Sequence, residues 1–427
     1  MRTGPAPAGK ISYACNARKV SRVSIVREPT TPIVVVNARG RARIVSGHPW
    51  VFRQDVLSGP PTDARTGGPA LVAVLDERRR PLASATWATL SPVALRILQR
   101  RSEDAPLPEL MALVAERLQA ALAWRQQLAL DRDAWRAVHA EADGLPGLFV
   151  DRYADAAVMQ TTSVAMDAAR PALASLLQKL LGVRVVVARD DGSARDFEGL
   201  PRVREIAAGE GTTEVVYRLG ENRLQADLLA DSKTGGFLDQ ADNHAVVAAL
   251  APAGARCLDA FTYHGGFALA LARRQGSVLA NDEDAQAVAR AQANASRNHL
   301  PNLEVRQANA FELLRTLEAD RQSFDVVVLD PPAFAKRKAG DHAALRGYQE
   351  IILRGLRLTK PGGLVVACSC SGRVSRAQFD ELVAAAAAQS GRSIQILERR
   401  GAGRDHPELA LVPETGHLKC WILRVLC

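Results

Sequence analysis

Apolar residues form two short uninterrupted runs in the second half of the chain, and each run ends in residues that can carry chemistry. Residues 326–329 read Val-Val-Val-Leu and lead into Asp330-Pro331-Pro332, and residues 364–367 read Leu-Val-Val-Ala and lead into Cys368-Ser369-Cys370. Such runs are typical of strands buried on both faces of a parallel sheet. Ligands of open α/β sheets bind at the carboxyl ends of these strands, so we expect the aspartate and the cysteines to meet in one crevice.

The chain from about residue 221 onwards alternates between strand and helix patterns, which predicts an α/β fold with a parallel, doubly wound sheet. Helices are expected at residues 268–274 and 285–298. Strands are expected at residues 257–261, 278–282, 303–305, 324–329 and 363–367.

The first part of the chain has shorter elements. Residues 33–97 read as short strands separated by Gly and Pro turn signals, a small β module. Its loops are basic and aromatic, with Arg41 followed closely by Trp50. RNA bases stack on aromatic rings while arginines bind phosphate, so we expect Arg41 and Trp50 to bind substrate. The alternative is that Trp50 packs in the core of the module.

A small α+β unit follows this module. A helix is expected at residues 107–128, a hairpin at 144–160, a second helix at 167–181 and a strand at 184–188. The unit has no nucleophile paired with a base, so we assign it to linkage and to substrate shape. Residues 1–32 are basic and lack the apolar core of a signal peptide, which favours a disordered arm or an extension from an upstream start codon.

Composition narrows the class of protein. A length of 427 residues favours two or three domains, and a net charge of +9 favours a polyanionic partner. The excess arises from basic clusters, at residues 39–43, 78–80, 100–101, 336–338 and 399–400. The six cysteines form no CxxC pair and no zinc spacing with histidine, so we expect no metal and a reducing cytoplasm. No apolar run approaches the roughly 20 residues that span a bilayer.

A glycine-containing turn after the first expected strand suggests a nucleoside-like cofactor. Asp259 to Phe267 contains Phe261 and the pair Gly265-Gly266, where the backbone can approach a ligand closely. Asp282 ends the second strand, where a carboxylate can accept both hydroxyls of a ribose. The turn is not GxGxxG, so S-adenosylmethionine (SAM) is favoured over a dinucleotide. Asn309, after the third strand, is expected at the adenine edge, and an exposed turn residue is the alternative.

Cysteine beside Asp330-Pro331-Pro332 points to methylation of a pyrimidine at C5. This carbon is a poor nucleophile until a thiolate adds to C6, so a cysteine is needed where amino-group methylation needs none. Cys257, Cys420 and Cys427 are expected to be packing residues. We expect Asp330 and the two prolines to hold the target base.

The motifs together resemble the bacterial 23S rRNA cytosine-5 methyltransferase I family, which contains SAM-dependent class I RNA methyltransferases with a PUA domain. The matching segments are Gly47-His48-Pro49-Trp50-Val51-Phe52, Gly235-Gly236-Phe237-Leu238-Asp239-Gln240, Phe261-Thr262-Tyr263-His264-Gly265-Gly266-Phe267, Asp330-Pro331-Pro332, Ser369-Cys370-Ser371-Gly372 and Asp405-His406-Pro407. The resemblance covers nearly everything after residue 33. Two positions depart from the family pattern, Asn309, where an acidic residue is expected, and His264.

The resemblance implies a domain plan: an arm at 1–32, a PUA-like RNA-binding domain at 33–100, an α+β middle domain at 101–215 and a Rossmann-like methyltransferase domain at 216–427. It also implies that Cys370 is the nucleophile and Cys368 a neighbour. From the strand ends and the turn we expect Asp259, Phe261, Gly265, Gly266, Asp282, Asn309 and Asp330 at the cofactor. The implied partner is large-subunit ribosomal RNA, with no membrane partner; a homodimer is one alternative for the oligomeric state.

Several alternatives remain open from the sequence. The base that removes the C5 proton is either Asp330 or Glu414, which lies in a segment similar to one that supplies a base in uracil-5 methyltransferases. The enzyme could act on uracil instead of cytosine, or methylate an adenine amino group through Asp330-Pro331-Pro332 alone. An RNA-binding scaffold with an inactive methyltransferase domain is the alternative of another class.

Overall fold

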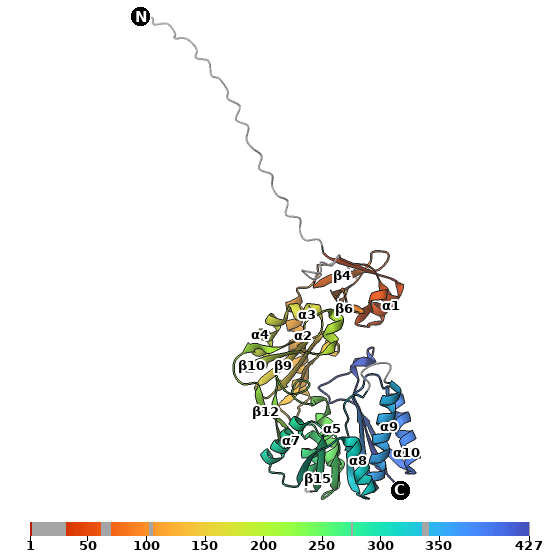
Figure 1. The fold of residues 1–427 in the computed structure, drawn as a ribbon. Coiled ribbons are helices and arrows are strands. Elements are labelled where there is room, and N and C mark those ends of the chain that lie inside the picture. Colours follow the sequence, from red (N-terminus) through yellow and green to blue (C-terminus); the bar gives the residue numbers. More distant parts are fainter. Residues whose placement is uncertain (2–30, 61–69, 102–105, 275, 335–340, 427) are drawn as a thin grey trace. The chain divides into compact units, whose positions relative to one another are not determined.

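The computed structural model describes residues 1, 31–60, 70–101, 106–274, 276–334 and 341–426 (Figure 1). The predicted arm at residues 1–32 and the basic cluster at 336–338 therefore lie almost entirely outside the described residues, as does Cys427. The chain divides into residues 1–31 and residues 32–427, and the second unit contains all of the elements below.

The amino-terminal module is a six-stranded sheet with one helix. Its strand order is β2-β6-β5-β4-β1-β3. The strands are β1 (Ile33–Val36), β2 (Trp50–Phe52), β3 (Val56–Ser58), β4 (Leu71–Leu75), β5 (Pro81–Trp87) and β6 (Val93–Arg100). Alternate residues of these strands, among them Val34, Val36, Val72 and Val74, form its buried core.

The basic segment of this module is a helix, α1 (Ala38–Ser46), and not the loop that we expected. Asn37 caps its amino end by accepting a hydrogen bond from the Gly40 amide at 2.9 Å, and Gly47 ends it in the left-handed conformation (φ 93°). Only Gly40 and Ile44 of this helix are buried. Two buried positions are too few to give the apolar periodicity by which a helix is recognised in a sequence.

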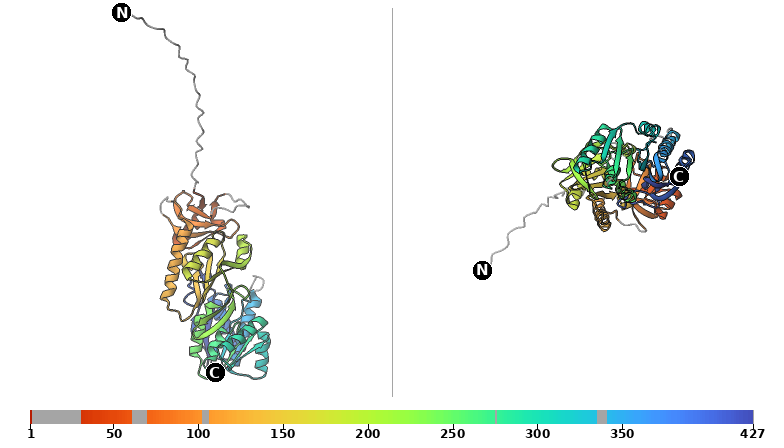
Figure 2. Two further views of the ribbon diagram at one scale, coloured as in Figure 1. Left: turned by 90° about the vertical axis from the view of Figure 1, so that its left-hand side faces the viewer. Right: turned by 90° about the horizontal axis from the view of Figure 1, so that it is seen from below.

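The middle region is a five-stranded sheet of order β11-β10-β9-β8-β7. Its strands are β7 (Ala134–His139), β8 (Leu148–Tyr153), β9 (Ala156–Thr161), β10 (Val185–Asp190) and β11 (Val203–Gly209). Helices α2 (Leu110–Gln127) and α4 (Arg170–Leu181) pack on one face (Figures 1 and 2). The helix expected at 167–181 is divided, with a short α3 (Val164–Ala168) before it, because Pro171 starts a new helix.

The carboxyl-terminal sheet has seven strands in the order β16-β15-β14-β17-β18-β20-β19. The strands are β14 (Arg256–Asp259), β15 (Ser277–Asp282), β16 (Leu303–Gln307), β17 (Phe324–Leu329), β18 (Thr359–Ser369), β19 (Ile394–Arg400) and β20 (Lys419–Val425). The first five are parallel, as expected, whereas β20 is antiparallel to both β18 and β19, a reversal that the sequence pattern did not reveal.

Helices cover both faces of this sheet. They are α5 (Ala241–Leu250), α6 (Gly266–Ala272), α7 (Ala285–Arg297), α8 (Ala310–Ala319), α9 (Asp341–Leu358) and α10 (Arg376–Ser390). Val326 and Val328 of β17 pack in the cluster that contains α5 and α6 residues, whereas Val327 and Leu329 pack with α8, α9 and α10. Burial on both faces explains the uninterrupted apolar runs. None of the described helices is long and apolar enough to cross a membrane.

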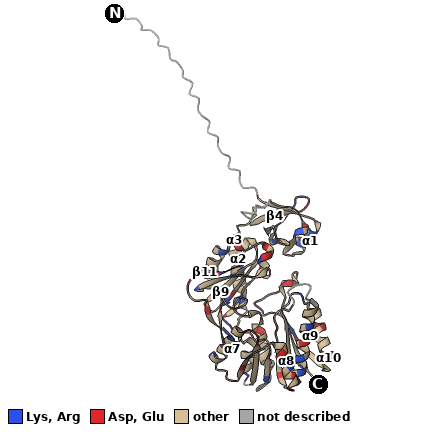
Figure 3. Ribbon diagram, viewed as in Figure 1, with Lys and Arg blue, Asp and Glu red and all other residues tan. Residues whose placement is uncertain are grey.

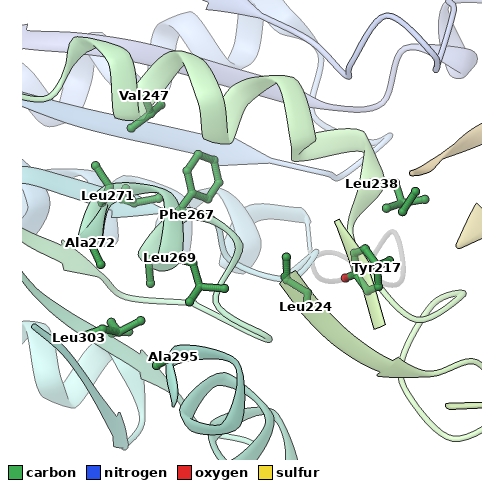
Figure 4. Close-up of a cluster of buried hydrophobic side chains, with 14 of the residues drawn as sticks. Tyr217, Leu224, Leu238, Val247, Phe267, Leu269, Leu271, Ala272, Ala295 and Leu303 are labelled. Atoms are coloured by element: carbon green, nitrogen blue, oxygen red, sulfur yellow. The ribbon is translucent and has the colours of Figure 1, made fainter. Parts of the chain in front are cut away.

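The middle sheet and the carboxyl-terminal domain share one hydrophobic cluster. Tyr153, Val158 and Val187 from the free face of the middle sheet belong to the same cluster as Phe267 of α6. The hairpin of β12 (Glu214–Leu219) and β13 (Asn222–Asp227) contributes Tyr217 and Leu224 to the same cluster, which Figure 4 shows in close-up. The two regions are therefore joined by a common core rather than by a linker alone.

Candidate active site

A cavity of about 430 Å³ opens at the carboxyl ends of β14, β15, β17 and β18. The strand order reverses between β14 and β17, and this reversal is where open α/β sheets bind ligands. The volume of the cavity lies in the range of about 300–1,000 Å³ that is usual for small-molecule sites. The predicted site residues that line it are Phe261, Gly266, Asp282, Asn309, Asp330, Pro331, Pro332 and Cys370.

The turn after β14 forms one wall of the cavity and is held in a strained conformation. Tyr263 has a φ of 49°, which is rare for a residue other than glycine, and Gly265 has a φ of 94°. The Tyr263 amide donates to Asp282 Oδ2 at 2.8 Å, which fixes the turn against the end of β15. A side chain at Gly266 would overlap the ring of His244, so the backbone alone fits at this point.

Asp259 and Gly265 support the cavity from behind and do not line it. The Asp259 carboxyl is buried and accepts a hydrogen bond from the Thr262 hydroxyl at 2.8 Å, while its Oδ1 has no partner among the described residues. Burial raises the pKa of Asp259 to about 7. Its direct contact with a cofactor therefore stays a prediction.

Asn309 is the amino-terminal cap of α8. Its Oδ1 accepts from the Phe311 amide at 3.1 Å, and its Nδ2 donates to Glu283 Oε2 at 3.2 Å. The side chain is exposed and lines the cavity. Capping is thus one role of this residue, and contact with an adenine edge is the untested one.

Asp330 follows β17 and is oriented by a chain of amide groups. Gln240 Nε2 donates to Asp330 Oδ2 at 2.9 Å, Asn243 Nδ2 donates to Gln240 Oε1 at 2.6 Å, and Arg400 donates to Asn243 Oδ1 at 2.7 Å. Burial and the nearby Asp239 raise the pKa of Asp330 to about 7. The carboxyl group is therefore fixed in direction and divided between its protonated and ionised forms at neutral pH.

The two cysteines at the end of β18 have different surroundings. Cys368 is buried, packs in the cluster shared with α5 and α6, and pairs in register with Cys420 of β20. Cys370 lies just beyond the strand, is partly exposed and lines the cavity. Burial, reinforced by Asp330, raises the pKa of the Cys370 thiol, and Lys233 opposes this effect. Of the cysteines that the structure describes, Cys370 alone lines this cavity.

Lys419 holds the loop that carries Cys370. Its buried Nζ donates to the carbonyl oxygens of Ser371 at 2.6 Å and His417 at 2.7 Å. Burial lowers the pKa of Lys419 to about 8. A buried cation next to the thiol fixes the loop and favours the thiolate electrostatically.

Three sequence-predicted residues lie away from the cavity. Glu414, the second candidate base, is exposed on a short turn (Pro413–Thr415) and does not line it. Trp50 donates from Nε1 to Glu141 Oε1 at 3.0 Å, so its indole contacts the middle region. Arg41, on the basic helix α1 seen in Figure 3, lies 3.8 Å from Asp76 and is half exposed. RNA binding by Arg41 and Trp50 stays a prediction.

Sequence analysis missed the roles of Asp239 and Gln240. Both line the cavity, and Gln240 bonds the candidate catalytic aspartate. They lie in the Gly235–Gln240 segment that matches the family, but this segment precedes the strand-and-turn pattern and carries no chemical signature of its own. Among the described residues, no group of three or more His, Cys, Asp or Glu could hold a metal ion.

Comparisons with known proteins agree with this architecture. A family described as a methyltransferase domain matches residues 252–401, and one described as a PUA-like domain matches residues 34–100, which confirms the predicted PUA-like module. Several relatives carry the name ribosomal RNA large subunit methyltransferase I, and two of them serve as examples. The protein from Tolumonas auensis is 35% identical over 89% of this chain and 96% of its own length, and the protein from Yersinia pestis is 32% identical over 92% and 99%.

A solved structure described as a methyltransferase complexed with SAH has the same fold. It superimposes with a TM-score of 0.77 over 92% of this chain and all of its own, at 16% identity. A second one, from Streptococcus mutans, has a TM-score of 0.76 at the same coverage. At this identity the likeness establishes the fold alone.

Proposed function

The chain belongs to the ribosomal RNA large subunit methyltransferase I family, and from this premise we propose that it is a SAM-dependent rRNA methyltransferase that modifies C5 of a cytosine through a covalent adduct with Cys370. The single observation that carries the proposal is the presence of Cys370 and Asp330-Pro331-Pro332 in one cavity with four of the other expected cofactor residues, Phe261, Gly266, Asp282 and Asn309. Amino-group methylation of adenine needs no thiol at this position.

The cavity residues fit SAM. Asp282 ends β15 with its carboxylate at the cavity, where it can accept the ribose hydroxyls, and Gly266 leaves room for no side chain beside His244. Phe261 and Phe311 supply an apolar wall for the adenine. When bound, SAM supplies an electrophilic methyl group on a sulfonium.

The reaction follows from the placement of the thiol. The Cys370 thiolate forms a bond to C6 of the base, and the C5–C6 π electrons move to C5, which becomes nucleophilic and takes the methyl group. A base then removes the C5 proton, the C5–C6 double bond reforms, and the C6–S bond breaks to return the thiolate. Asp330, held by Gln240, faces the base during these steps and can bond its N3 edge.

We assign RNA capture to the PUA-like domain and the basic surface. The chain carries a net charge of +9, and Arg39, Arg41 and Arg43 of α1 stay partly exposed although each pairs with an aspartate. Paired arginines can still exchange partners with phosphate, and such contacts give salt-dependent affinity without sequence readout.

Methyl transfer from labelled SAM to ribosomal RNA, followed by digestion to nucleosides, tests the proposal. Wild type should label 5-methylcytidine, and Cys370→Ala should abolish the label because no adduct can form. Cys368→Ala is the matched control, since this residue lies two positions away but packs in the core; it should retain methylation. Label in methyladenosine that survives Cys370→Ala would overturn the mechanism, and label in 5-methyluridine would change the base.

A further inference from the structure

The covalent mechanism leaves one proton, that on C5, without a partner fixed by the site. Asp330 is bonded by Gln240, and its raised pKa of about 7 leaves much of it protonated at neutral pH. A protonated carboxyl group can donate to the base but cannot accept the C5 proton. Glu414 does not line the cavity. The need for another base rests on the proposed C5 chemistry.

Asp239 is a second carboxylate at the same end of the cavity. It lies on the short turn Leu238–Gln240, next to the residue that orients Asp330, and it is a lining residue of the cavity although it is only 7% exposed. The Gly403 amide donates to its backbone carbonyl at 2.9 Å, which fixes the turn. The other carboxylates of the cavity, Asp282, Glu283 and Asp284, lie at and directly after the end of β15.

His417 links Asp239 to solvent. Its Nε2 lies 3.7 Å from Asp239 Oδ2, and its side chain is one-third exposed. It precedes β20, and its carbonyl accepts from Lys419, whose other bond holds the Cys370 loop. Asp239, the His417 imidazole and the Cys370 loop are thus connected by one ionic contact at 3.7 Å and by the two hydrogen bonds of Lys419.

The two carboxyl groups have opposite tendencies. Burial alone would raise the pKa of Asp239, but His417, Lys233 and His406 hold it well below its usual range, so this group is ionised. Two neighbouring carboxyl groups whose pKa values are separated by their surroundings are a recurrent arrangement for an acid and a base.

We propose that Asp239 is the base that takes the C5 proton from the methylated adduct, and that His417 positions Asp239 and passes the proton to solvent. The carboxylate oxygen forms a bond to the proton, and the C–H electrons reform the C5–C6 double bond. The C6–S bond breaks, and its electrons return to Cys370 as the thiolate. No further reactant is needed.

Removal of this base should stop the reaction after methyl transfer. Asp239→Asn keeps the shape of the side chain but cannot accept the proton, so a methyl-labelled enzyme–RNA adduct that resists denaturing gel electrophoresis should accumulate. Release of methylated RNA should fall by at least about 100-fold, the usual contribution of a general base. Cys370→Ala should form no adduct in the same assay.

RNA that contains 5-fluorocytidine tests whether Asp239→Asn can still form the covalent adduct. Fluorine at C5 cannot leave as a proton, so wild type and Asp239→Asn should trap this RNA to the same extent. His417→Ala should release product slowly, and added imidazole should restore release, which a merely structural role would not allow. Glu414→Gln should behave as wild type.

The outcomes separate this inference from the proposed function. If Asp239→Asn traps fluorinated RNA but releases product from ordinary RNA near the wild-type rate, Asp239 is not the base. If Asp239→Asn fails to trap fluorinated RNA, the residue acts before the adduct forms, and the inference is equally overturned. If that variant does not fold, release of methylated RNA by His417→Ala at the wild-type rate would overturn the route through Asp239 and His417. If wild type forms no 5-methylpyrimidine at all, the proposed function fails instead.

Discussion

Asp330 is partly buried, and its carboxyl group interacts with those of Asp239 and Asp259. This environment determines its protonation state and its effect on the stability of the fold. At a pKa of about 7 the group is protonated below neutral pH, when it can donate to the N3 of cytosine. When ionised it can only accept, which suits the N3–H of uracil. The same side chain therefore favours different bases on the two sides of neutrality.

For a cytosine enzyme, this predicts that kcat/KM falls with rising pH, with an inflection near pH 7. It should be superimposed on the rise due to ionisation of Cys370. Asp330→Asn should remove the inflection and lower kcat/KM by about 100-fold or more. An inflection of the opposite sign, with activity gained above pH 7, would indicate uracil.

Asp330→Asn should stabilise the fold although it lowers the activity. The folded pKa of Asp330 lies above the usual value near 4, so its contribution to stability is present below pH 4 and lost as pH rises to about 7. Asp330→Asn should therefore raise the thermal midpoint at pH 7.5, and this gain should vanish at pH 4.

Sequence analysis reached the cavity residues that end apolar strands, because burial on two faces leaves a clear signal. Asp330 and Cys370 were found in this way. Asp239, Gln240 and His417 were not assigned roles, because their positions depend on how a short turn and the segment before β20 fold back onto the sheet. Contacts between residues some 90 or more positions apart have no local pattern.

At the scale of elements, the turn between β14 and α6 has no room for a side chain at Gly266. Gly266→Ala adds a Cβ that would overlap His244, so His244 or the turn must move, at about 1–3 kcal/mol of unfolding free energy. Calorimetry should show weaker SAM binding, and urea unfolding a lower midpoint. Gly192→Ala, where a Cβ meets nothing within 4 Å, should leave both unchanged.

Elements that are long and periodic were predicted well, and short or interrupted ones were not. Helix α2 and the hairpin of β8 and β9 match their predicted ranges closely. Helix α1 was missed because two inward positions set its register, and β19 because Gln395 and Glu398 interrupt its apolar pattern. The apolar run of β20 is only four residues long, between Lys419 and Arg424. Strand β19 follows helix α10, but β20 then runs in the opposite direction, which the alternation of strands and helices does not predict.

At the scale of the whole molecule, Asp405 joins the carboxyl-terminal segment to the middle region. Its Oδ1 accepts from Arg132 at 2.9 Å, its Oδ2 from the Arg136 amide at 2.9 Å, and its carbonyl from Arg125 at 2.9 Å. Burial alone would raise the pKa of Asp405, but His406 and Arg132 hold it far below its usual value.

Asp405→Ala should lower the free energy of unfolding by about 3–5 kcal/mol, because it leaves Arg132 buried with an incomplete set of partners. The depressed pKa means that this stabilisation is present above pH 4 and is lost as pH falls further. Urea unfolding between pH 3 and 7 measures both effects. Asp196→Asn, at a half-exposed pair with Arg202, should change little at any pH.

The common core of the middle sheet and the carboxyl-terminal domain has a consequence during synthesis. Strand β11 ends at Gly209, so the middle sheet is complete when only half of the chain has left the ribosome, yet its face with Tyr153, Val158 and Val187 lacks its cover. At about 5–20 residues per second, translation of the remainder takes on the order of 10–40 s. Throughout that interval the nascent chain carries an uncovered apolar surface, which makes it a client for chaperones before it can become an enzyme.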